Sequence, residues 1–271
     1  MPTAPLDDAL AFPPPEPCLL NPAVMSLITL LTDFGTADGY VGEMKGVICA
    51  MAGEARVVDI AHDVAPQDVE GARLALARYW KRFPLGTVHI VVVDPGVGSQ
   101  RAAIAVASEG RMLVGPDNGV LSPALLMQGA RTVALHVPPQ ASATFHGRDV
   151  FAPAAARLAS GEPLERLGVP HPSPVIRRTP EVVRGEDGTA VGEVIAVDRF
   201  GNLVTNLVAP HGGIVEVAGR AVPVARTYAD GPSGALVAVI GSSGLVEVAV
   251  RDGSASRVLG LGRGGRVVLR R

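Results

Sequence analysis

The segment from Val88 to Val93 is rich in β-branched apolar residues and ends in an acid, Asp94. A short run of this kind fits a strand that is buried on both faces, as in a parallel sheet. A tight Pro-Gly-Val-Gly turn follows, and Arg101 comes shortly after it. Ligands of open α/β sheets bind at the carboxyl ends of such strands. We therefore expect Asp94 at a strand tip near a ligand, although an acid that merely caps a strand-to-turn junction explains this segment alone equally well.

The first half of the chain alternates between strand and helix patterns. Apolar residues recur at helical spacing in residues 39–51, 68–83 and 151–161, whereas residues 26–33, 55–62, 88–93, 102–108 and 111–120 have strand character. This alternation predicts an α/β fold with a mostly parallel sheet, flanking helices and right-handed crossovers.

The pattern changes after about residue 172. A proline-rich segment leads into short apolar strands that are separated by turns with Gly, Pro and Asp, which is typical of a small all-β, barrel-like domain. We interpret residues 1–24 as a disordered proline-rich extension, 25–172 as the α/β catalytic domain, 173–181 as a linker and 182–271 as the barrel-like domain.

Composition excludes several classes of partner. A formal net charge of -2 and 4% aromatic residues give no basic patch or stacking surface for nucleic acid. No apolar stretch reaches the roughly 20 residues of a membrane helix. Two cysteines, Cys18 and Cys49, make no disulfide framework, so we expect a cytoplasmic protein.

Four polar clusters interrupt the apolar chain, and three of them directly follow strands, which gathers them at one sheet edge. They are residues 32–35, 94–101, 115–119 and 144–149. An Asp, an Arg and a His converge in this arrangement. A carboxylate and an imidazole are the usual groups for holding and deprotonating water, and a guanidinium orients a carboxylate.

Each cluster also has a purely structural explanation. Asp33 caps a helix, Asp117 and Asn118 form a turn, and Arg148 pairs with Asp149. His146 fills a structural role in this interpretation, and His62 is a weak candidate for a supporting residue. Because no GxGxxG follows a strand, and GxxxxGK[ST], HExxH, paired CxxC and GxSxG are absent, the sequence indicates no dinucleotide, phosphate-loop, zinc or serine-nucleophile site. We expect neither a metal nor a cofactor.

Taken together, the ordered clusters TDFG, VVDIAH, DPGVGSQR, GPDNG, TFHGRD, VDRFGNLVTN and GSAS resemble those of the S-adenosyl-L-methionine (SAM) hydroxide adenosyltransferases, which are related to SAM-dependent fluorinases and chlorinases. The resemblance covers residue 28 to the C-terminus. It implies that water attacks C5′ of SAM to give adenosine and L-methionine. It assigns Asp94 and His146 to binding and deprotonating the water, and Arg101 to orienting Asp94.

The resemblance also implies substrate contacts in the α/β domain. Asp33 corresponds to the carboxylate that accepts hydrogen bonds from the ribose hydroxyls, and Thr144 to a residue near the ribose and C5′.

Further contacts are implied in the barrel-like domain, which completes the nucleoside site. Asp198 and Asn202 match an element that holds the methionine amino group and part of the nucleoside, while Phe200 and Tyr228 are candidates for packing on adenine. Ser242 and Ser243 correspond to the residues that bind the methionine carboxylate. Fluorinases have an arginine at the second of these positions. In this chain, hydroxyl and backbone donors or Arg251 must therefore hold the carboxylate.

Relatives are trimers with the site between the N-terminal domain of one subunit and the C-terminal domain of the next, so the resemblance implies a homotrimer.

Two other functions stay open: a SAM-dependent halogenase (chlorinase) and a non-enzymatic SAM- or adenosine-binding protein. Halogenating relatives have a Tyr-Ser pair where this chain has His146 and Gly147. Because Gly147 offers no hydroxyl for a halide, and Arg101 of the hydrolase set is present, hydrolysis is favoured.

Overall fold

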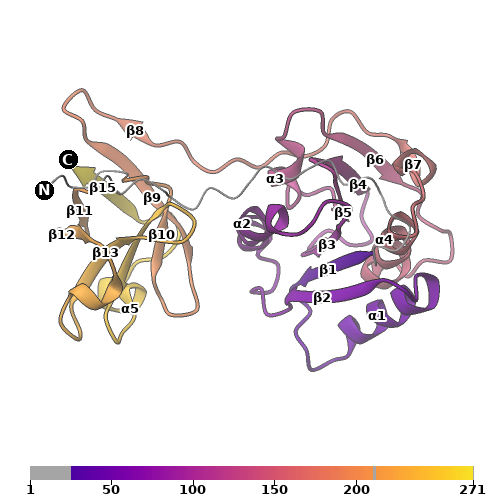
Figure 1. Cartoon of the computed structure of the whole chain (residues 1–271), viewed down its shortest axis with the longest axis horizontal. Helices are drawn as coiled ribbons and strands as arrows, with labels where there is room; N and C mark the ends of the chain where they lie inside the picture. Colours follow the sequence, from indigo (N-terminus) through magenta and orange to yellow (C-terminus); the bar gives the residue numbers. More distant parts are fainter. Residues whose placement is uncertain (1–25, 210–211, 271) are drawn as a thin grey trace, which may run out of the picture.

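The computed structural model describes residues 26–209 and 212–270, which form two lobes joined by an extended segment (Figure 1). An α/β sheet with flanking helices precedes a closed β-barrel, which confirms the predicted fold class. The predicted disordered extension at residues 1–24 lies outside the described residues. No helix in the described part of the chain is long and apolar enough to cross a membrane.

The first lobe contains a seven-stranded sheet, counted over the described residues, in the order β2-β1-β3-β5-β4-β6-β7. Its strands are β1 (Leu27–Thr32), β2 (Arg56–Ala61), β3 (Val88–Val92), β4 (Ala103–Ser108), β5 (Arg111–Pro116), β6 (Arg131–Leu135) and β7 (Gly168–Pro170). β2, β1, β3, β5 and β6 run in one direction, and β4 and β7 run in the other. The strand order reverses between β1 and β3, because the chain passes from β1 outward to β2 and then crosses to β3.

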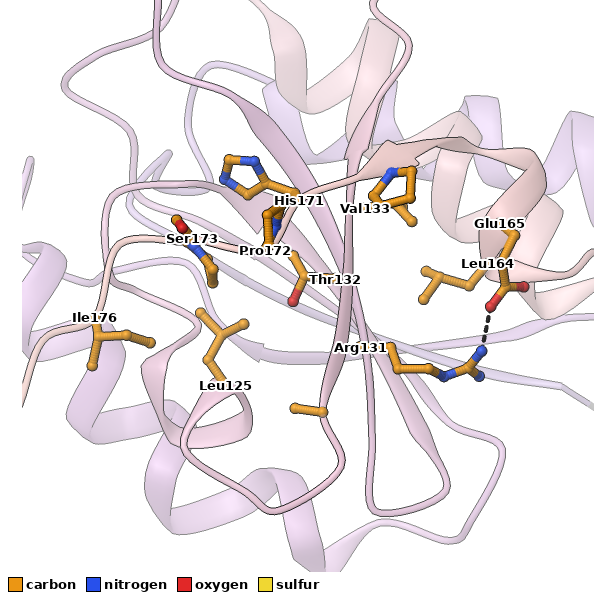
Figure 2. A pocket seen from close by; sticks show the side chains of 13 residues that line it. Leu125, Arg131, Thr132, Val133, Leu164, Glu165, His171, Pro172, Ser173 and Ile176 are labelled. Atoms are coloured by element: carbon orange, nitrogen blue, oxygen red, sulfur yellow. Dashed lines mark hydrogen bonds and ion pairs between the residues drawn. The ribbon is translucent and has the colours of Figure 1, made fainter.

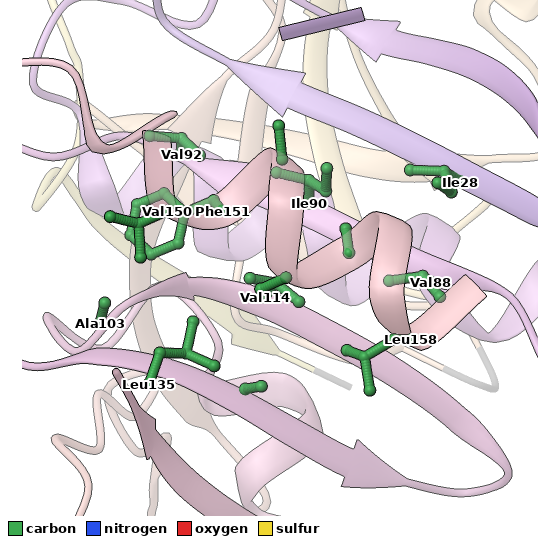
Figure 3. Packing of buried hydrophobic residues seen from close by; sticks show 14 of the residues in the cluster. Ile28, Val88, Ile90, Val92, Ala103, Val114, Leu135, Val150, Phe151 and Leu158 are labelled. Atoms are coloured by element: carbon green, nitrogen blue, oxygen red, sulfur yellow. The ribbon is translucent and has the colours of Figure 1, made fainter. Parts of the chain in front are cut away.

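Helices cover both faces of this sheet. They are α1 (Tyr40–Met51), α2 (Val69–Tyr79), α3 (Ser122–Leu125) and α4 (Ala152–Ala159). Alternate residues of one strand pack on opposite faces: Ile90 lies in the core with α1 and α4, and Val91 in the core with α2 and α3. Figure 3 shows α4 lying along the first of these cores, over Ile28, Ile90 and Val114. The run from Val88 to Val93 is therefore buried on both faces, as its composition predicts.

Two local features differ from the sequence expectations. The helix predicted for residues 68–83 ends at Tyr79 and continues as a short 3-10 turn, Trp80–Arg82, before Pro84. A one-turn π-helix, Gly147–Phe151, precedes α4. This π-helical turn leads directly into α4. It places His146 just ahead of the helix, at the edge where the strands end.

The second lobe is the barrel. Its strands are β8 (Val183–Arg184), β9 (Ala190–Val197), β10 (Leu203–Thr205), β11 (Ile214–Val217), β12 (Arg220–Ala225), β13 (Leu236–Ile240), β14 (Val246–Val250) and β15 (Arg266–Arg270), with one short helix, α5 (Ala255–Leu259). Pairing of β10 with β9 closes the barrel, and β8 extends it at β9. Its interior is filled by small and β-branched side chains such as Val194, Val215 and Val248.

The segment between the lobes is tied to the α/β domain. The carboxylate of Asp117 accepts hydrogen bonds from His171 Nε2 and Val175 N, at 2.9 and 2.8 Å. Arg177 Nε donates to the carbonyl oxygen of Asn118, at 2.8 Å. The third polar cluster of the sequence thus holds the linker.

The barrel itself contacts α2. Arg263 donates from both terminal nitrogens to Asp68, at 2.8 and 3.0 Å, and from Nε to the carbonyl oxygen of Ile195, at 2.9 Å. Asp68 is also the N-cap of α2, where it accepts from Gly71 N. A Cβ at Gly71 would lie 2.3 Å from Asp68 Oδ2, so this position has no room for a side chain.

Candidate active site

Acidic side chains follow three neighbouring parallel strands. Asp33 comes after β1, Asp94 after β3 and Asp117 after β5, and these strands are adjacent in the sheet. Asp33 and Asp94 therefore stand on the two sides of the point where the strand order reverses. Ligands of doubly wound sheets bind in the crevice at this point.

Asp94, Arg101 and His146 come together as the sequence predicts. Arg101 Nε donates to Asp94 Oδ1 at 2.9 Å, and its Nη2 donates to Asp94 Oδ2. The same Nη2 lies 3.1 Å from His146 Nδ1. The side chains of Asp94 and Arg101 are only 5% and 11% exposed, so water screens this ion pair weakly.

The contact between Arg101 and His146 determines the tautomer of the imidazole. A guanidinium only donates, so His146 Nδ1 accepts, and the neutral ring carries its proton on Nε2. Burial and the positive charge of Arg101 lower the pKa of His146, although Asp94 and Asp149 oppose this shift. The ring is therefore neutral near pH 7 and presents Nε2–H as a donor.

Glycine allows the two loops of this site to pack closely. Gly98 has φ +76°, and a Cβ there would lie 2.4 Å from the carbonyl oxygen of Ala143. This approach brings the loop after β3 onto the loop that contains Thr144 and His146. Gly147 is enclosed as well: a Cβ would lie 3.1 Å from Phe34 and 3.2 Å from Met44 and Phe145.

Asp33 lies in a turn that is fixed by its neighbours. Its Oδ2 accepts from Gln67 N at 2.7 Å. The ring of Phe34 packs edge-on against Tyr40 and Phe145, with centroids 6.2 and 5.9 Å apart. Sequence reasoning missed Gln67, because its contact depends on a backbone angle that composition does not reveal.

Thr144 and the following charged residues surround this turn. Thr144 is exposed, with Oγ1 3.2 Å from Ser142 Oγ. Arg148 pairs with Asp149 at 2.7 Å and with Glu43 at 2.8 Å, and its guanidinium lies over the ring of Phe145. The local ion pair expected between Arg148 and Asp149 is therefore present.

In the barrel, Asp198 and Asn202 bind each other. Asp198 Oδ1 accepts from the backbone N of Phe200 and of Asn202, both at 2.9 Å, and Oδ2 accepts from Asn202 Nδ2 at 2.9 Å. The turn that they close presents Phe200 with 76% of its surface exposed. An exposed aromatic ring on a rigid turn is suited to stacking on a ligand.

Tyr228 lies on the turn between β12 and β13, and Arg251 follows β14. Tyr228 OH donates to Glu247 Oε2 at 2.6 Å, a partner that the sequence did not suggest. Arg251 Nη1 donates to the carbonyl oxygens of Ala229 and Gly231, at 3.1 and 2.7 Å. Arg251 therefore braces the turn that carries Tyr228.

A cavity of about 770 Å³ lies between α2 and the barrel. Its lining includes Asp198, Ser242 and Ser243 but none of Asp94, Arg101 and His146, as far as the described residues are concerned. The Asp198 turn also contacts the segment after β2, where Arg199 Nη1 lies 3.5 Å from Asp63 Oδ2.

A second hollow, of about 570 Å³, lies beside β6 and β7 against the linker (Figure 2). Its walls are mostly apolar, and the ion pair between Arg131 and Glu165 borders it. None of the candidate site residues lines it. No group of three or more His, Cys, Asp or Glu side chains within residues 26–209 and 212–270 is arranged to hold a metal ion.

Comparison with known proteins connects this geometry to a family. Residues 28–168 match the SAM hydroxide adenosyltransferase N-terminal domain, and residues 192–268 match its C-terminal domain. The chain belongs to the SAM hydroxide adenosyltransferase family. The two matches fall on the α/β sheet and on the barrel.

Named relatives are similar over most of their length. A protein of Thermus thermophilus named (R)-S-adenosyl-L-methionine hydrolase is 46% identical over 254 residues, which cover 89% of this chain and 98% of that protein. One of Salinispora arenicola with the same name is 42% identical, covering 86% and 93%. A fluorinase of Actinopolyspora mzabensis is 28% identical over 82% of this chain and 90% of its own.

Solved structures have the same two-domain fold. The crystal structure of an uncharacterized conserved protein from Thermotoga maritima has a TM-score of 0.81 at 34% identity, covering 91% of this chain and 100% of that one. The crystal structure of a conserved hypothetical protein from Thermus thermophilus gives 0.78 at 45% identity, with the same coverage.

Proposed function

We propose that this protein is an enzyme that hydrolyses SAM to adenosine and L-methionine. The observation that best supports this proposal is the contact of Arg101 with both Asp94 and His146 at the point where the strand order reverses. Relatives at 40–46% identity that are named (R)-S-adenosyl-L-methionine hydrolase support the substrate.

The reaction needs a positioned water and little else. The water oxygen bonds to C5′ while the C5′–S bond breaks, and the electron pair of that bond stays on sulfur, which becomes the neutral thioether of methionine. Because the sulfonium is already a good leaving group, no acid has to protonate it. Orientation of the water in line with the C5′–S bond therefore supplies most of the catalysis.

The three residues have different tasks in this mechanism. His146 donates its Nε2–H to the water oxygen, because its Nδ1 is engaged by Arg101. Asp94 accepts a proton from the water, since each of its oxygens retains a lone pair beside the bond from Arg101. Arg101 orients both partners. No metal or cofactor takes part.

The substrate is held by both domains. Asp33 accepts hydrogen bonds from the ribose hydroxyls, and Thr144 lies near C5′. In the barrel, Asp198 and Asn202 contact the methionine amino group and the nucleoside, and the aromatic rings of Phe200 and Tyr228 pack on adenine.

The methionine carboxylate has hydroxyl and backbone donors at Ser242 and Ser243. Arg251 contributes indirectly, because it already donates to the Tyr228 turn. The cavity that Asp198, Ser242 and Ser243 line does not include Asp94, Arg101 or His146. This supports a homotrimer whose sites form between the α/β domain of one subunit and the barrel of the next. We place the enzyme in the cytoplasm.

The test is chromatography of SAM incubated with the purified protein. We expect equimolar adenosine and methionine, unaffected by EDTA, and a loss of most turnover with retained SAM binding in Asp94→Asn and His146→Ala. Chloride in the buffer distinguishes the halogenase, since it would give 5′-chloro-5′-deoxyadenosine. SAM that binds but stays intact would instead identify a binding protein, and full activity in both variants would refute the assigned roles.

A further inference from the structure

The turn from Thr32 to Gly35, here called the β1 turn, carries Asp33 and lies against the segment that follows β2. β1 and β2 are adjacent and parallel, so both segments leave the sheet at the same edge. His62 begins the second segment and Gln67 ends it. Each of these two residues contacts the β1 turn directly.

His62 holds the β1 turn at both of its ends. Its Nδ1 lies 2.9 Å from Thr32 Oγ1, and its carbonyl oxygen accepts from Gly35 N at 2.7 Å. Thr32 is fully buried and His62 is 7% exposed, so water does not compete for these bonds. Loss of the imidazole would leave the Thr32 hydroxyl without its partner.

A directional chain of polar groups supports this contact. His62 Nε2 lies 3.0 Å from Asp59 Oδ1, an ion-pair distance without hydrogen-bond alignment. Because Nε2 faces a carboxylate, which only accepts, the proton is favoured on Nε2, and Nδ1 accepts from Thr32. Thr32 Oγ1 in turn accepts from Phe34 N at 3.3 Å. Burial alone would raise the pKa of Asp59, but the hydrogen bond from Lys45 and the nearby imidazole of His62 outweigh it and lower that pKa. The chain is therefore oriented from Asp59 to the β1 turn.

Gln67 holds the carboxylate itself. Its backbone N–H donates to Asp33 Oδ2 at 2.7 Å, and its φ of 66° lies in the left-handed region that residues with a side chain rarely adopt. Such strain persists where the surrounding structure requires it. Oδ1 of Asp33 has no donor among the described residues, so one oxygen is fixed and the other is free to accept a hydrogen bond from a ligand.

We propose that His62 is a positioning residue that, together with the Gln67 backbone, sets the Asp33 carboxylate for recognition of a ribose diol. This inference rests on the proposed function, in which Asp33 binds the ribose. A carboxylate that is held in place loses little conformational entropy when it binds two adjacent hydroxyls. His62 is 7% exposed and contacts Thr32, Gly35 and Asp59, so we expect it to act on the sugar only through the β1 turn.

The experiment compares the binding of adenosine and 2′-deoxyadenosine by calorimetry. We expect the wild type to bind adenosine about tenfold more tightly, because one charge-assisted hydrogen bond separates the two nucleosides. In His62→Phe we expect this preference to fall to about threefold or less, with 2′-deoxyadenosine bound nearly as before. His136→Phe, at an exposed histidine, is the matched control.

Two further variants keep the test decisive. Gln67→Gly retains the N–H and accepts the positive φ, so it should discriminate like the wild type. Asp59→Asn leaves His62 in place but weakens its partner, so it should give an intermediate preference even where His62→Phe does not fold.

Equal weakening of both nucleosides in His62→Phe, or an unchanged preference, would overturn the inference, as would a wild type that binds the two equally. SAM turnover is measured separately on the same wild-type protein. If the wild type distinguishes the nucleosides and His62→Phe loses that preference, but the wild type leaves SAM intact, the proposed function fails and the role of His62 stands.

Discussion

Replacement of Arg101 by lysine tests the central contact of the site. The guanidinium makes three contacts with one rigid group: Nε with Asp94 Oδ1 at 2.9 Å, and Nη2 with both Asp94 Oδ2 and His146 Nδ1. A lysine keeps the charge but has a single nitrogen on a flexible stem, so it cannot reproduce this planar arrangement. Arg101→Lys therefore separates the geometry of the site from its net charge.

The expected loss follows from the bonds removed. A hydrogen bond to a charged group contributes about 1.5–3 kcal/mol, so the loss of one bond to Asp94 lowers kcat by about 10- to 150-fold. The SAM concentration for half-maximal rate should change little, because in the proposed mechanism Arg101 orients the groups around the water and not the substrate. Stability against heat should fall as well, since the pair is nearly buried.

The assay measures adenosine release from SAM at saturating concentration for the wild type, Arg101→Lys and Arg148→Lys. Arg148 is a suitable control because it lies next to the same loop and also pairs with carboxylates, Asp149 and Glu43, but is more exposed. If Arg101→Lys keeps kcat within about threefold of wild type, then bidentate orientation of Asp94 does not limit the reaction and our reasoning is wrong.

Two more predictions concern buried positions. His89 is buried against Thr29, and burial together with the charge of Arg111 lowers its pKa to about 3. The native state thus binds fewer protons than the unfolded state below pH 6.5, so the free energy of unfolding should fall by about 2 kcal/mol from pH 7 to 5. In urea titrations, His89→Gln should lack this decrease. Equal decreases in the wild type and the variant would contradict the prediction. Gly147→Ser should lower the free energy of unfolding by about 1–3 kcal/mol, because the new side chain crowds Phe34. With SAM and chloride it should form no chlorinated nucleoside. Formation of that product would show that this position alone determines the nucleophile.

The sequence predicts the sheet and much of its active edge, because these depend on local patterns. Short apolar, β-branched runs indicate the strands, and the acids at their ends place Asp33 and Asp94 on one edge. β6 is not among the predicted strands, since Arg131–Leu135 is short and its exposure alternates weakly. This segment is a strand because it pairs antiparallel with β4.

Polar partners distant in sequence could not be predicted. Asp117 has the signature of a turn, but its carboxylate holds residues more than 50 positions later in the linker. Arg251 has the charge expected of a carboxylate-binding residue, yet its guanidinium donates to backbone carbonyl oxygens. Such choices depend on which acceptors the fold brings near, and a residue type does not encode them.

The anchored linker has a consequence for assembly. Asp117 and Asn118 accept hydrogen bonds from residues 171–177, and Arg73 donates to Thr179. Arg263 of the barrel donates to Asp68 of the α/β domain. Only a short stretch between the two domains therefore lacks such contacts. These contacts consequently limit the orientations of the barrel relative to the α/β domain. In the proposed homotrimer, association would then cost less rotational freedom than it would for two loosely tethered domains, and the effective concentration of correctly oriented surfaces would be high from the start.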